Sequence, residues 1–403
     1  MGMQRCALVT GGSGFLGSYV VRDLLAEGFD RVVVLMRGGD SDECEQRLRS
    51  LWWERQELVD EVGGRIQVVC GDVCAERMGL APDAYGKLAA QVTHIVHAAA
   101  EIGVNETAQR FGEVNVEGTL NVLLFAEAAA RAGALERLVH VSTAYVAGMR
   151  EGGVLEDELV DAGFNSLYEQ SKFGAEQLVH DAGSRIPASI VRPAQIVGDS
   201  KTGFVATFNT LYYPLKLYLK GQLPVLPVSA AQKLNMVPVD YVSRMVVCAL
   251  LEPSAEGKTF HAVVPADCQP TAGEMLEAVR EWARDNLQFD PGTPRFVPAP
   301  AAARLGRVRN LAPSDAPKRK SIAQNMLALA PYFSENRTYD TANAQELVGA
   351  VGPDWRTYLP GLLAYAVRKG FLNHTGRTVF QQMLVRLSSK RNTISYYDVT
   401  SDG

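Results

Sequence analysis

Short apolar runs alternate with longer stretches of helical period along the first two thirds of the chain. The runs with the clearest strand character are 6–10, 31–36, 66–73, 94–100, 138–143 and 188–193. Helical patterns separate them, and regular alternation of this kind predicts an α/β fold with a parallel sheet and helices on both faces. A later run, 259–264, is expected to return to the same sheet.

The pattern changes beyond about residue 198. Residues 204–219 are aromatic and aliphatic with few charges, which fits either the wall of a substrate pocket or the core of a smaller lobe. The Pro- and Ala-rich stretch 291–317 and the basic Lys318-Arg319-Lys320 indicate a solvated part of that lobe. Trp355–Phe371 predicts a further helix, and the polar tail to Gly403 could link to another domain.

These patterns suggest two domains. Residues 1–200, with 233–265 returning to them, would form a Rossmann-type, doubly wound domain that binds a dinucleotide. Residues 201–232 and 266–403 would form a smaller, mostly helical substrate lobe and the tail.

Composition narrows the classes of function. The chain has 403 residues, 47% of them hydrophobic, and a net charge of -5, which argues against nucleic acid or an anionic membrane as a partner. Its six cysteines do not form a disulfide framework, and Cys70 and Cys74 lack a second pair at metal-binding spacing. No signal peptide or transmembrane run is expected, so the sequence predicts a cytoplasmic protein without a metal site.

A glycine-rich turn follows the first strand. Gly11-Gly12-Ser13-Gly14-Phe15-Leu16-Gly17 joins that strand to an amphipathic helix, and a second strand follows at 31–36. Gly11 would permit the tight turn, Gly14 would let the backbone approach a pyrophosphate, and Gly17 would let helix and strand pack closely. The helix N-terminus would then face the phosphates.

The second strand ends at the residue that chooses the cofactor. An acid there would bind the ribose 2′-hydroxyl of NAD, whereas an arginine accommodates the 2′-phosphate of NADP. This chain has Arg37, and Arg47 follows ten residues later, so NADP is expected. The alternative for Arg47 is a solvated position on a helix.

Further candidates follow the third and fourth strands. Asp72 is expected beside the adenine, and the small Ala98-Ala99-Ala100 would leave room for the cofactor. His97 closes a buried strand, where a histidine is more often a packing or hydrogen-bonding residue than a catalyst.

Tyr168 and Lys172 form the candidate acid–base pair. Positions i and i+4 of a helix share one face, about 6 Å apart. A free phenol has a pKa near about 10, and an adjacent ammonium lowers it by favouring the phenolate. Such a tyrosine can exchange a proton at neutral pH. The alternative is an exposed helix face without chemistry.

With Asn115, Thr143, Tyr168 and Lys172 in one chain, residues 5–265 resemble the extended short-chain dehydrogenase/reductases. The motifs that carry the resemblance are 10–17, Thr-Gly-Gly-Ser-Gly-Phe-Leu-Gly, and 168–172, Tyr-Glu-Gln-Ser-Lys. The resemblance assigns a catalytic hydroxyl to Thr143, with Ser142 as the fallback, and a supporting role to Asn115 through a water or backbone link to Lys172.

Three details are similar to the thioester reductases, which include reductase domains of carboxylic acid reductases and nonribosomal peptide synthetases and the fatty acyl reductases. They are Arg37 with Arg47, the loop 192–203, and the segment 235–242. The resemblance implies that NADP(H) is bound by Gly11, Ser13, Gly14, Phe15, Leu16, Gly17, Arg37, Arg47, Asp72, Val73, Ala98, Ala99, Ala100, Thr143, Tyr168, Lys172, Pro193 and Ile196.

The implied reaction is NADPH-dependent reduction of an acyl thioester, on coenzyme A or an acyl carrier protein, to an aldehyde. A second hydride would give the alcohol, and the sequence leaves this open. Two alternatives remain. One is another extended short-chain enzyme that acts on a hydroxysteroid-like or sugar-nucleotide substrate, and the other is a non-catalytic scaffold that senses the nucleotide.

Overall fold

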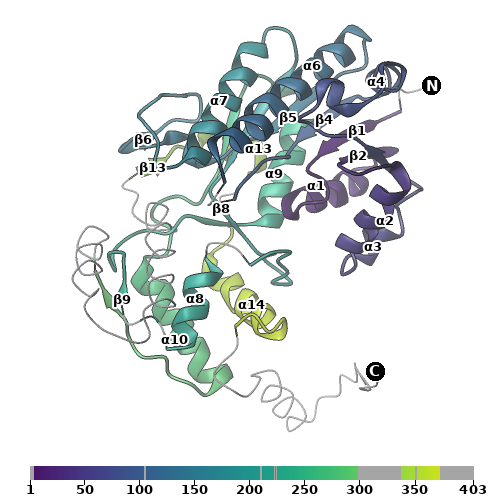
Figure 1. Cartoon of the computed structure of the whole chain (residues 1–403). Coiled ribbons are helices and arrows are strands. Elements are labelled where there is room, and N and C mark those ends of the chain that lie inside the picture. Colours follow the sequence, from purple (N-terminus) through teal and green to yellow (C-terminus); the bar gives the residue numbers. More distant parts are fainter. Residues whose placement is uncertain are drawn as a thin grey trace, which may run out of the picture.

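The chain forms a large α/β domain and a smaller helical lobe. Figure 1 shows the large domain at the top and the lobe below it. The computed structural model describes residues 4–103, 106–208, 211–221, 223, 225–297, 337–349 and 352–372. The basic 318–320 stretch, most of 291–317 and the polar tail therefore lie outside the described residues.

The large domain is built on a parallel sheet of seven strands in the order β11-β7-β5-β4-β1-β2-β3. Its strands are β1 (Cys6–Thr10), β2 (Arg31–Met36), β3 (Ile66–Cys70), β4 (His94–His97), β5 (Arg137–Val141), β7 (Ala188–Pro193) and β11 (Thr259–Ala262). The chain builds outward from β1 on one side and then crosses to β4 on the other. The point where the order reverses, between β1 and β4, is where such sheets bind ligands. The predicted doubly wound fold is confirmed.

Helices cover both faces of this sheet (Figure 1). The helical segments are α1 (Phe15–Ala26), α2 (Ser41–Leu51), α3 (Gln56–Val59), η1 (Glu76–Gly79), α4 (Pro82–Ala89), α5 (Ala108–Phe111), η2 (Gly112–Glu117), α6 (Gly118–Arg131), η3 (Ala144–Ala147), α7 (Leu167–Ala182), α8 (Tyr212–Leu219), α9 (Val239–Leu251), η4 (Pro253–Ala255), α10 (Ala272–Leu287), α13 (Ala342–Val348) and α14 (Trp355–Arg368).

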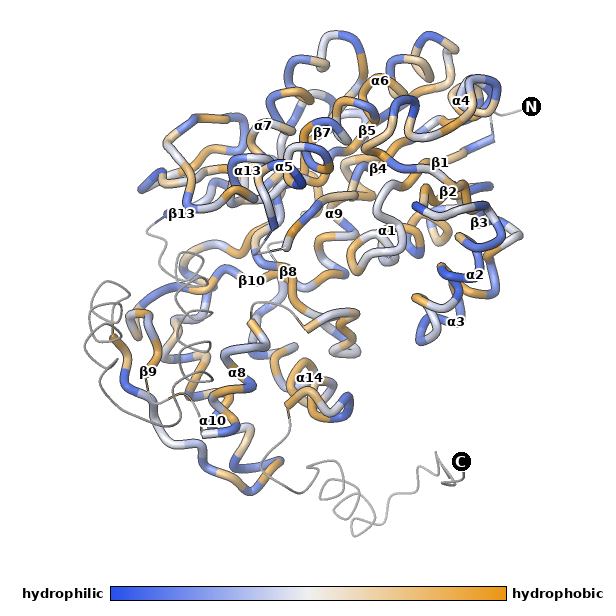
Figure 2. Tube along the Cα trace, viewed as in Figure 1, coloured by the Kyte–Doolittle hydropathy of each residue, from blue (hydrophilic) through white to orange (hydrophobic). Residues whose placement is uncertain are grey.

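Each face of the sheet has its own apolar core. Ala7 and Val9 of β1 pack with α1 and α9 on one face, while Leu8 between them packs with α6 on the other. Because both faces are covered, the strands are continuously apolar rather than alternating with polar residues. Figure 2 shows this as orange stretches along the strands.

Four strands end two or three residues earlier than the apolar runs predicted. These are β3, β4, β5 and β11, and each leaves the sheet at the carboxyl edge. The first amide after β3, β4 and β5 still donates to the neighbouring strand, as Ala98 N–H does to Thr10 O at 3.2 Å. Further along, amides bond to side chains: Cys74 N–H donates to Asp72 Oδ1 at 3.0 Å and Ala99 N–H to Thr10 Oγ1 at 3.4 Å. The helical segment between β4 and β5 is divided, since η2 is a π-helix that directly precedes α6.

The smaller lobe packs α8, α10 and α14 around an apolar cluster of its own. Most of the aromatic and aliphatic segment 204–219 lies in this cluster. Leu211, Pro214 and Leu215 also line a cavity of about 60 Å³, which has almost entirely apolar walls. An apolar cavity of about 150 Å³ holds one benzene, so this one is too small for a long acyl chain. The segment is therefore chiefly core.

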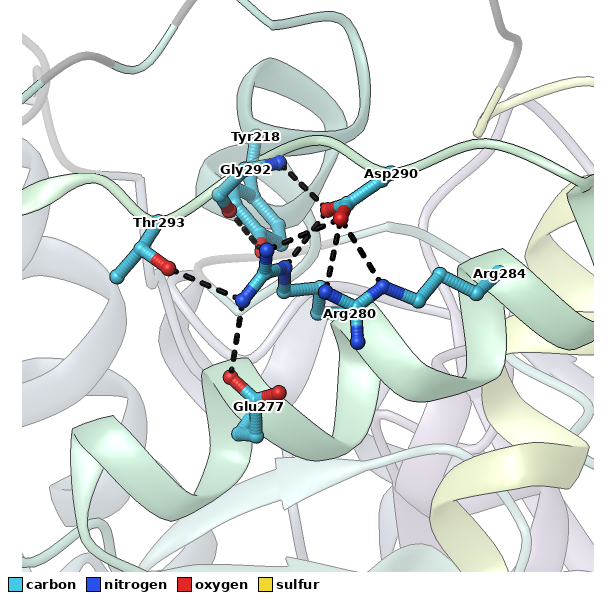
Figure 3. Close-up of polar contacts among 7 residues, drawn as sticks. All are labelled: Tyr218, Glu277, Arg280, Arg284, Asp290, Gly292 and Thr293. Carbon is cyan, nitrogen blue, oxygen red and sulfur yellow. Dashed lines mark hydrogen bonds and ion pairs between the residues drawn. The ribbon is translucent and has the colours of Figure 1, made fainter.

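A polar network fixes the loop after α10 (Figure 3). Asp290 accepts hydrogen bonds from both Arg280 and Arg284, and Tyr218 Oη donates to Gly292 O at 2.8 Å. The loop leads into β12 (Arg295–Phe296), which pairs with β9 (Val225–Leu226). Because Leu226 lines the cavity, the network holds one of its walls in place.

Aromatic and ionic contacts join the lobe to the large domain. The Phe15 ring, at the start of α1, lies 6.1 Å from Phe204, whose ring is 5.7 Å from Tyr365 on α14. Lys369 forms a 2.6 Å ion pair with Glu54. The glycine-rich turn is thus in direct contact with the lobe.

Residues 337–348 return to the large domain, although the sequence boundaries placed them in the smaller lobe. β13 (Arg337–Tyr339) pairs in parallel with β6 (Gly152–Val154), and α13 packs against α9 and β11. A short two-stranded pairing between β8 (Gln195–Val197) and β10 (Met236–Pro238) lies next to the sheet. Among the described helices, none is long and apolar enough to cross a membrane.

The packing at Gly17 gives a test of the glycine turn. A Cβ there would lie 2.1 Å from Gly11 O and 2.8 Å from Gly12 Cα, and backbone atoms cannot rotate aside. We expect Gly17→Ala to lower the free energy of unfolding by about 1–3 kcal/mol, as measured by urea denaturation.

Gly86, inside α4, is the matched control, since nothing lies within 4 Å of a Cβ added there. Gly86→Ala should stabilise the protein by up to about 1 kcal/mol, because alanine is the better helix former. Equal effects of the two substitutions would contradict close packing at Gly17.

Candidate active site

The glycine-rich turn brings β1 against the end of β4. Gly11 has φ +72°, and a Cβ there would lie 2.6 Å from Ala98 C and Ala99 N. Only glycine fits both the conformation and the contact. The turn closes with a hydrogen bond from Gly14 N–H to Gly11 O at 2.9 Å.

The N-terminus of α1 fits an anion. Gly14 is its N-cap, no side chain caps the helix, and its first turn contains no acidic residue. Uncapped N–H groups and the positive end of the helix dipole together suit a phosphate group. The turn can therefore hold the pyrophosphate of a dinucleotide. Within it Phe15 turns toward the lobe, and Leu16 packs against the core.

Two exposed arginines meet where β2 ends. Arg47, on α2, donates through Nη2 to the backbone carbonyl of Arg37. The nearby acids are engaged in capping, since Asp40 accepts from Glu43 N–H at 2.8 Å and Glu43 accepts from Gly39 N–H at 2.8 Å. The residue directly after β2, where an NAD site has an acid, is thus the exposed Arg37.

The remaining expected cofactor residues gather along the same carboxyl edge. Asp72 and Val73 follow β3, and Val73 O accepts a hydrogen bond from Asn121 at 2.7 Å. Ala98, Ala99 and Ala100 follow β4 and are partly exposed, and Pro193 and Ile196 lie in β7 and β8.

Helix α7 carries the acid–base candidates. It begins after Ser166, whose side chain accepts from Glu169 N–H, a common N-cap. Tyr168 lies in the first turn, half-buried, with its ring 6.3 Å from that of Phe111. Lys172, one turn further, is buried. The two are not on an exposed face.

The ammonium of Lys172 is docked on the end of β5. Nζ donates to Val141 O at 2.8 Å and to His140 Nε2 at 3.3 Å. Burial lowers the pKa of Lys172 to about 8, and the charge of Glu176 opposes this shift. An ammonium has three N–H donors, so these two acceptors leave a third for a ligand or for Tyr168.

Thr143 lies just beyond β5. Its hydroxyl donates to Pro193 O at 3.4 Å and accepts from Tyr145 N–H at 3.3 Å. Ser142, the fallback, instead donates its hydroxyl to the buried carboxylate of Glu176. The bond from Thr143 is long and goes to a neutral carbonyl, whereas the bond from Ser142 goes to a buried carboxylate, so the Thr143 hydroxyl is the easier of the two to redirect to a ligand.

Asn115 lies in the π-helix η2, a distortion often found at functional sites. Its Nδ2 donates to Ser171 Oγ at 2.8 Å, and its Oδ1 accepts from Glu101 N–H at 2.7 Å. Ser171 Oγ in turn donates to Tyr168 O at 2.9 Å. Asn115 therefore reaches the neighbour of Lys172 rather than Lys172 itself. The sequence analysis missed Ser171; its position three residues after Tyr168 was the available signal.

His97 is a hydrogen-bonding residue, as the sequence predicted. Thr119 Oγ1 donates to Asn115 O at 2.6 Å, so it accepts from His97 Nε2–H at 2.9 Å. Nδ1 then accepts from Thr10 Oγ1 at 2.7 Å. Burial, and next the charge of Lys172, lower the pKa of His97 to about 3. The imidazole is neutral and links β1 to η2.

No cluster of three or more His, Cys, Asp or Glu side chains suited to a metal occurs in the described part of the chain. What the site can do rests on a phenol, an ammonium and a hydroxyl beside a dinucleotide-binding turn. These groups suit proton transfer coupled to chemistry supplied by a cofactor.

Comparison with known sequences assigns a family. The family model described as "Male sterility protein" matches residues 9–246. The chain belongs to this family. It also resembles the L-2-aminoadipate reductase large subunit of Penicillium chrysogenum, with 31% identity over 270 residues that cover 62% of this chain and 18% of that protein. A linear gramicidin synthase protein from Brevibacillus parabrevis is 30% identical over 70% of this chain and 6% of its own length.

The chain thus spans less than a fifth of these relatives. Among solved structures, the terminal R domain from the myxalamid PKS-NRPS biosynthetic pathway is 26% identical, with a TM-score of 0.77 over 92% of both chains. UDP-glucuronic acid 4-epimerase from Bacillus cereus in complex with NAD shares the fold, with 18% identity and a TM-score of 0.63 over 91% and 98% of the two chains. The resemblance to reductase domains of the extended short-chain class is confirmed.

The neutral state of His97 predicts a pH dependence of stability. In the unfolded chain the imidazole has a pKa of about 6.5, well above the pKa of His97 in the native state. Between the two values only the unfolded chain binds the proton, so stability is lost as pH falls below about 6.5. His97→Gln should reduce the slope of unfolding free energy against pH by up to about 1.4 kcal/mol per pH unit near pH 5–6.

The measurement is urea denaturation at a series of pH values. Thr119→Val is the control, because it breaks the same chain of hydrogen bonds without removing a titratable group. It should lower stability and leave the slope unchanged. A wild-type slope in His97→Gln would show that His97 is not the group responsible.

Proposed function

We propose that this chain reduces an acyl thioester to an aldehyde with NADPH, the acyl group being carried by an acyl carrier protein or coenzyme A. The observation that supports this most is the docking of Lys172 on the end of β5, between the helix of Tyr168 and the segment of Thr143. It brings the helix that carries Tyr168 and Lys172 against the segment that carries Thr143, at the edge of the sheet where the glycine turn also lies, and this supports an acid–base site there.

The cofactor would be held at three places. The N-terminus of α1 would take the pyrophosphate, Arg37 and Arg47 the 2′-phosphate, and Lys172 the ribose next to the nicotinamide. When bound, NADPH would supply the hydride. The residues after β4 are small enough to leave room along the strand ends.

Thr143 and Tyr168 would donate hydrogen bonds to the thioester oxygen as negative charge develops on it. Each such donor contributes roughly 2.7–4 kcal/mol to lowering the barrier. Tyr168 would also give its proton to this oxygen as general acid, so that hydride and proton together convert the thioester to a hemithioacetal. Cleavage of the C–S bond, with the hydroxyl proton passing to sulfur, would then release the aldehyde and the thiol of the carrier. The charge of Lys172 would stabilise the phenolate that remains. Asn115 and Ser171 would hold the first turn of α7 in place through the Tyr168 carbonyl.

The relatives favour a carrier protein over free coenzyme A. They include peptide-synthetase and aminoadipate reductase chains several times longer than this one. A thiolation-reductase di-domain from an archaeal non-ribosomal peptide synthetase shares the fold. Another extended short-chain enzyme would use the same three catalytic groups, so UDP-sugars and a hydroxysteroid belong in the assay beside the thioesters.

Turnover by Tyr168→Phe tests the proposed chemistry. With acyl-CoA and carrier-bound acyl substrates, we expect the wild type to consume NADPH and form aldehyde or alcohol. Tyr168→Phe should lose turnover by at least about 10²-fold, because the general acid is gone, while NADPH binding measured by fluorescence stays nearly unchanged.

Tyr85→Phe, on α4, removes a phenol away from the strand ends and should behave as wild type. Wild-type turnover by Tyr168→Phe would refute the catalytic role. Activity of the wild type on UDP-sugars or the hydroxysteroid alone would assign the chain to the alternative class.

Arg37→Ala tests the choice of cofactor. Only NADPH carries the extra phosphate, so its Kd should rise by about 10-fold or more, as expected for a lost charged hydrogen bond of about 1.5–3 kcal/mol. The Kd of NADH should change little. Arg131→Ala, at the exposed end of α6, is the control and should affect neither. Equal weakening of both nucleotides would remove the reason to propose NADP.

A further inference from the structure

A buried ion pair lies one turn beyond Lys172. Glu176 of α7 and Arg192 of β7 are 0% and 1% exposed. Glu176 Oε1 accepts from Arg192 Nε at 2.9 Å and also from Nη2. Removing two charges from water costs several kcal/mol for each ion, and apolar replacements are often equally stable. Stability alone therefore does not explain the pair.

The second oxygen of Glu176 reaches the segment that carries the catalytic groups. Ser142 Oγ donates to Glu176 Oε2. Ser142 lies between Val141, whose carbonyl receives the ammonium of Lys172, and Thr143. One carboxylate thus fixes the backbone that positions both Lys172 and the Thr143 hydroxyl.

Arg192 also helps to position Thr143, from the neighbouring strand β7. The next residue, Pro193, provides the carbonyl that accepts from Thr143. The other guanidinium N–H groups donate to Glu156 O at 3.3 Å and Glu158 O at 2.9 Å, and to His261 Nε2 at 3.2 Å. The guanidinium is held on every side, so it is a rigid anchor for Glu176.

Glu176 also controls the electrostatics around Lys172. Two imidazoles lie near Lys172, those of His140 on β5 and His97 on β4. Burial, and next the charge of Lys172, lower the pKa of both, so both are neutral. Tyr168 lies on the same helix as Lys172. Arg192 and His180 both contact Oε1 of Glu176. Burial would raise the pKa of Glu176, but Arg192 and hydrogen bonds from His180, Arg192 and Ser142 lower it to about 2. Glu176 is therefore a permanent negative charge one turn from the ammonium.

We propose that the Glu176–Arg192 pair is a positioning device for the catalytic groups: it joins α7 to the ends of β5 and β7 and keeps Lys172 charged in a buried site. Neither residue touches the reacting atoms. The proposal concerns the site of the proposed reductase, but the charge of Lys172 can be measured without any substrate.

Glu176→Gln keeps the shape and the hydrogen bond from Ser142 and removes the charge. Glu176 and Lys172 are one helical turn apart, about 6 Å. At an effective dielectric constant of about 20, a charge at this distance changes the pKa of its neighbour by roughly 1–2 units. We expect the titration midpoint of the Lys172 ¹³Cε signal to fall by about that amount. The signal is assigned by its loss in Lys172→Met.

Glu176→Gln leaves Arg192 unpaired and could fail to fold, so Glu176→Gln with Arg192→Met is the second variant. It has no uncompensated charge and should fold, and its Lys172 midpoint should fall by less than in Glu176→Gln, because the positive charge of Arg192 is removed as well. Asp181→Asn is the control, since Asp181 is an exposed carboxylate on the same helix, nine residues from Lys172 and therefore about 13 Å away along the axis. Its Lys172 midpoint should match the wild type.

An unchanged midpoint in a folded variant overturns the proposal, and so does failure of both variants to fold, which would make the pair purely structural. If thioester reduction is found, the fall of kcat/KM at alkaline pH should begin at a lower pH in Glu176→Gln than in the wild type, because Lys172 loses its charge earlier. A shifted midpoint in a protein that reduces no thioester would support the positioning pair and refute the proposed function, so the two outcomes are distinguishable.

Discussion

The site depends on keeping an ammonium charged inside the protein. Lys172 is buried among a backbone carbonyl, two imidazoles and a carboxylate. A buried amine that found no acceptors would lose its proton. Both of its hydrogen-bond acceptors are on β5, and the opposite charge of Glu176 is on its own helix, so the charge is stable only while α7 packs against the strand ends. The protonation of Lys172 therefore depends on the packing of the large domain.

Neutral histidines make this arrangement rigid without adding competing charge. His97 passes a chain of hydrogen bonds from Thr10, at the glycine turn, to Thr119 and on to the carbonyl of Asn115. The Asn115 side chain continues it through Ser171 to Tyr168. A protonated imidazole would repel Lys172 and could not accept from Thr10. The strand that leads to the nucleotide turn and the helix that carries the phenol are therefore positioned by one continuous network.

The sequence predicted what local pattern determines. Apolar runs marked all seven strands of the main sheet, the glycine turn marked the nucleotide end, and the spacing of Tyr168 and Lys172 marked one helix face. It did not predict Glu176 or Arg192, because a Glu in a helical stretch is ordinarily solvated and its partner is a strand residue chosen by the packing of α7 on the sheet. The pairing of β6 with β13 was missed for the same reason, since a three-residue strand has no signal until its distant partner is in place.

The apolar character of residues 204–219 has a similar explanation, and it limits what hydrophobicity says about the substrate. Leu215, Leu217 and Leu219 are buried in the core of the smaller lobe, and Phe204 joins that lobe to Phe15 in the glycine turn. The segment is apolar because it holds two parts of the molecule together. An apolar segment of this kind would be needed whether the acyl group were aliphatic or polar. The apolar character of this segment is therefore no guide to the substrate, because the segment supplies the packing that joins the lobe to the glycine turn.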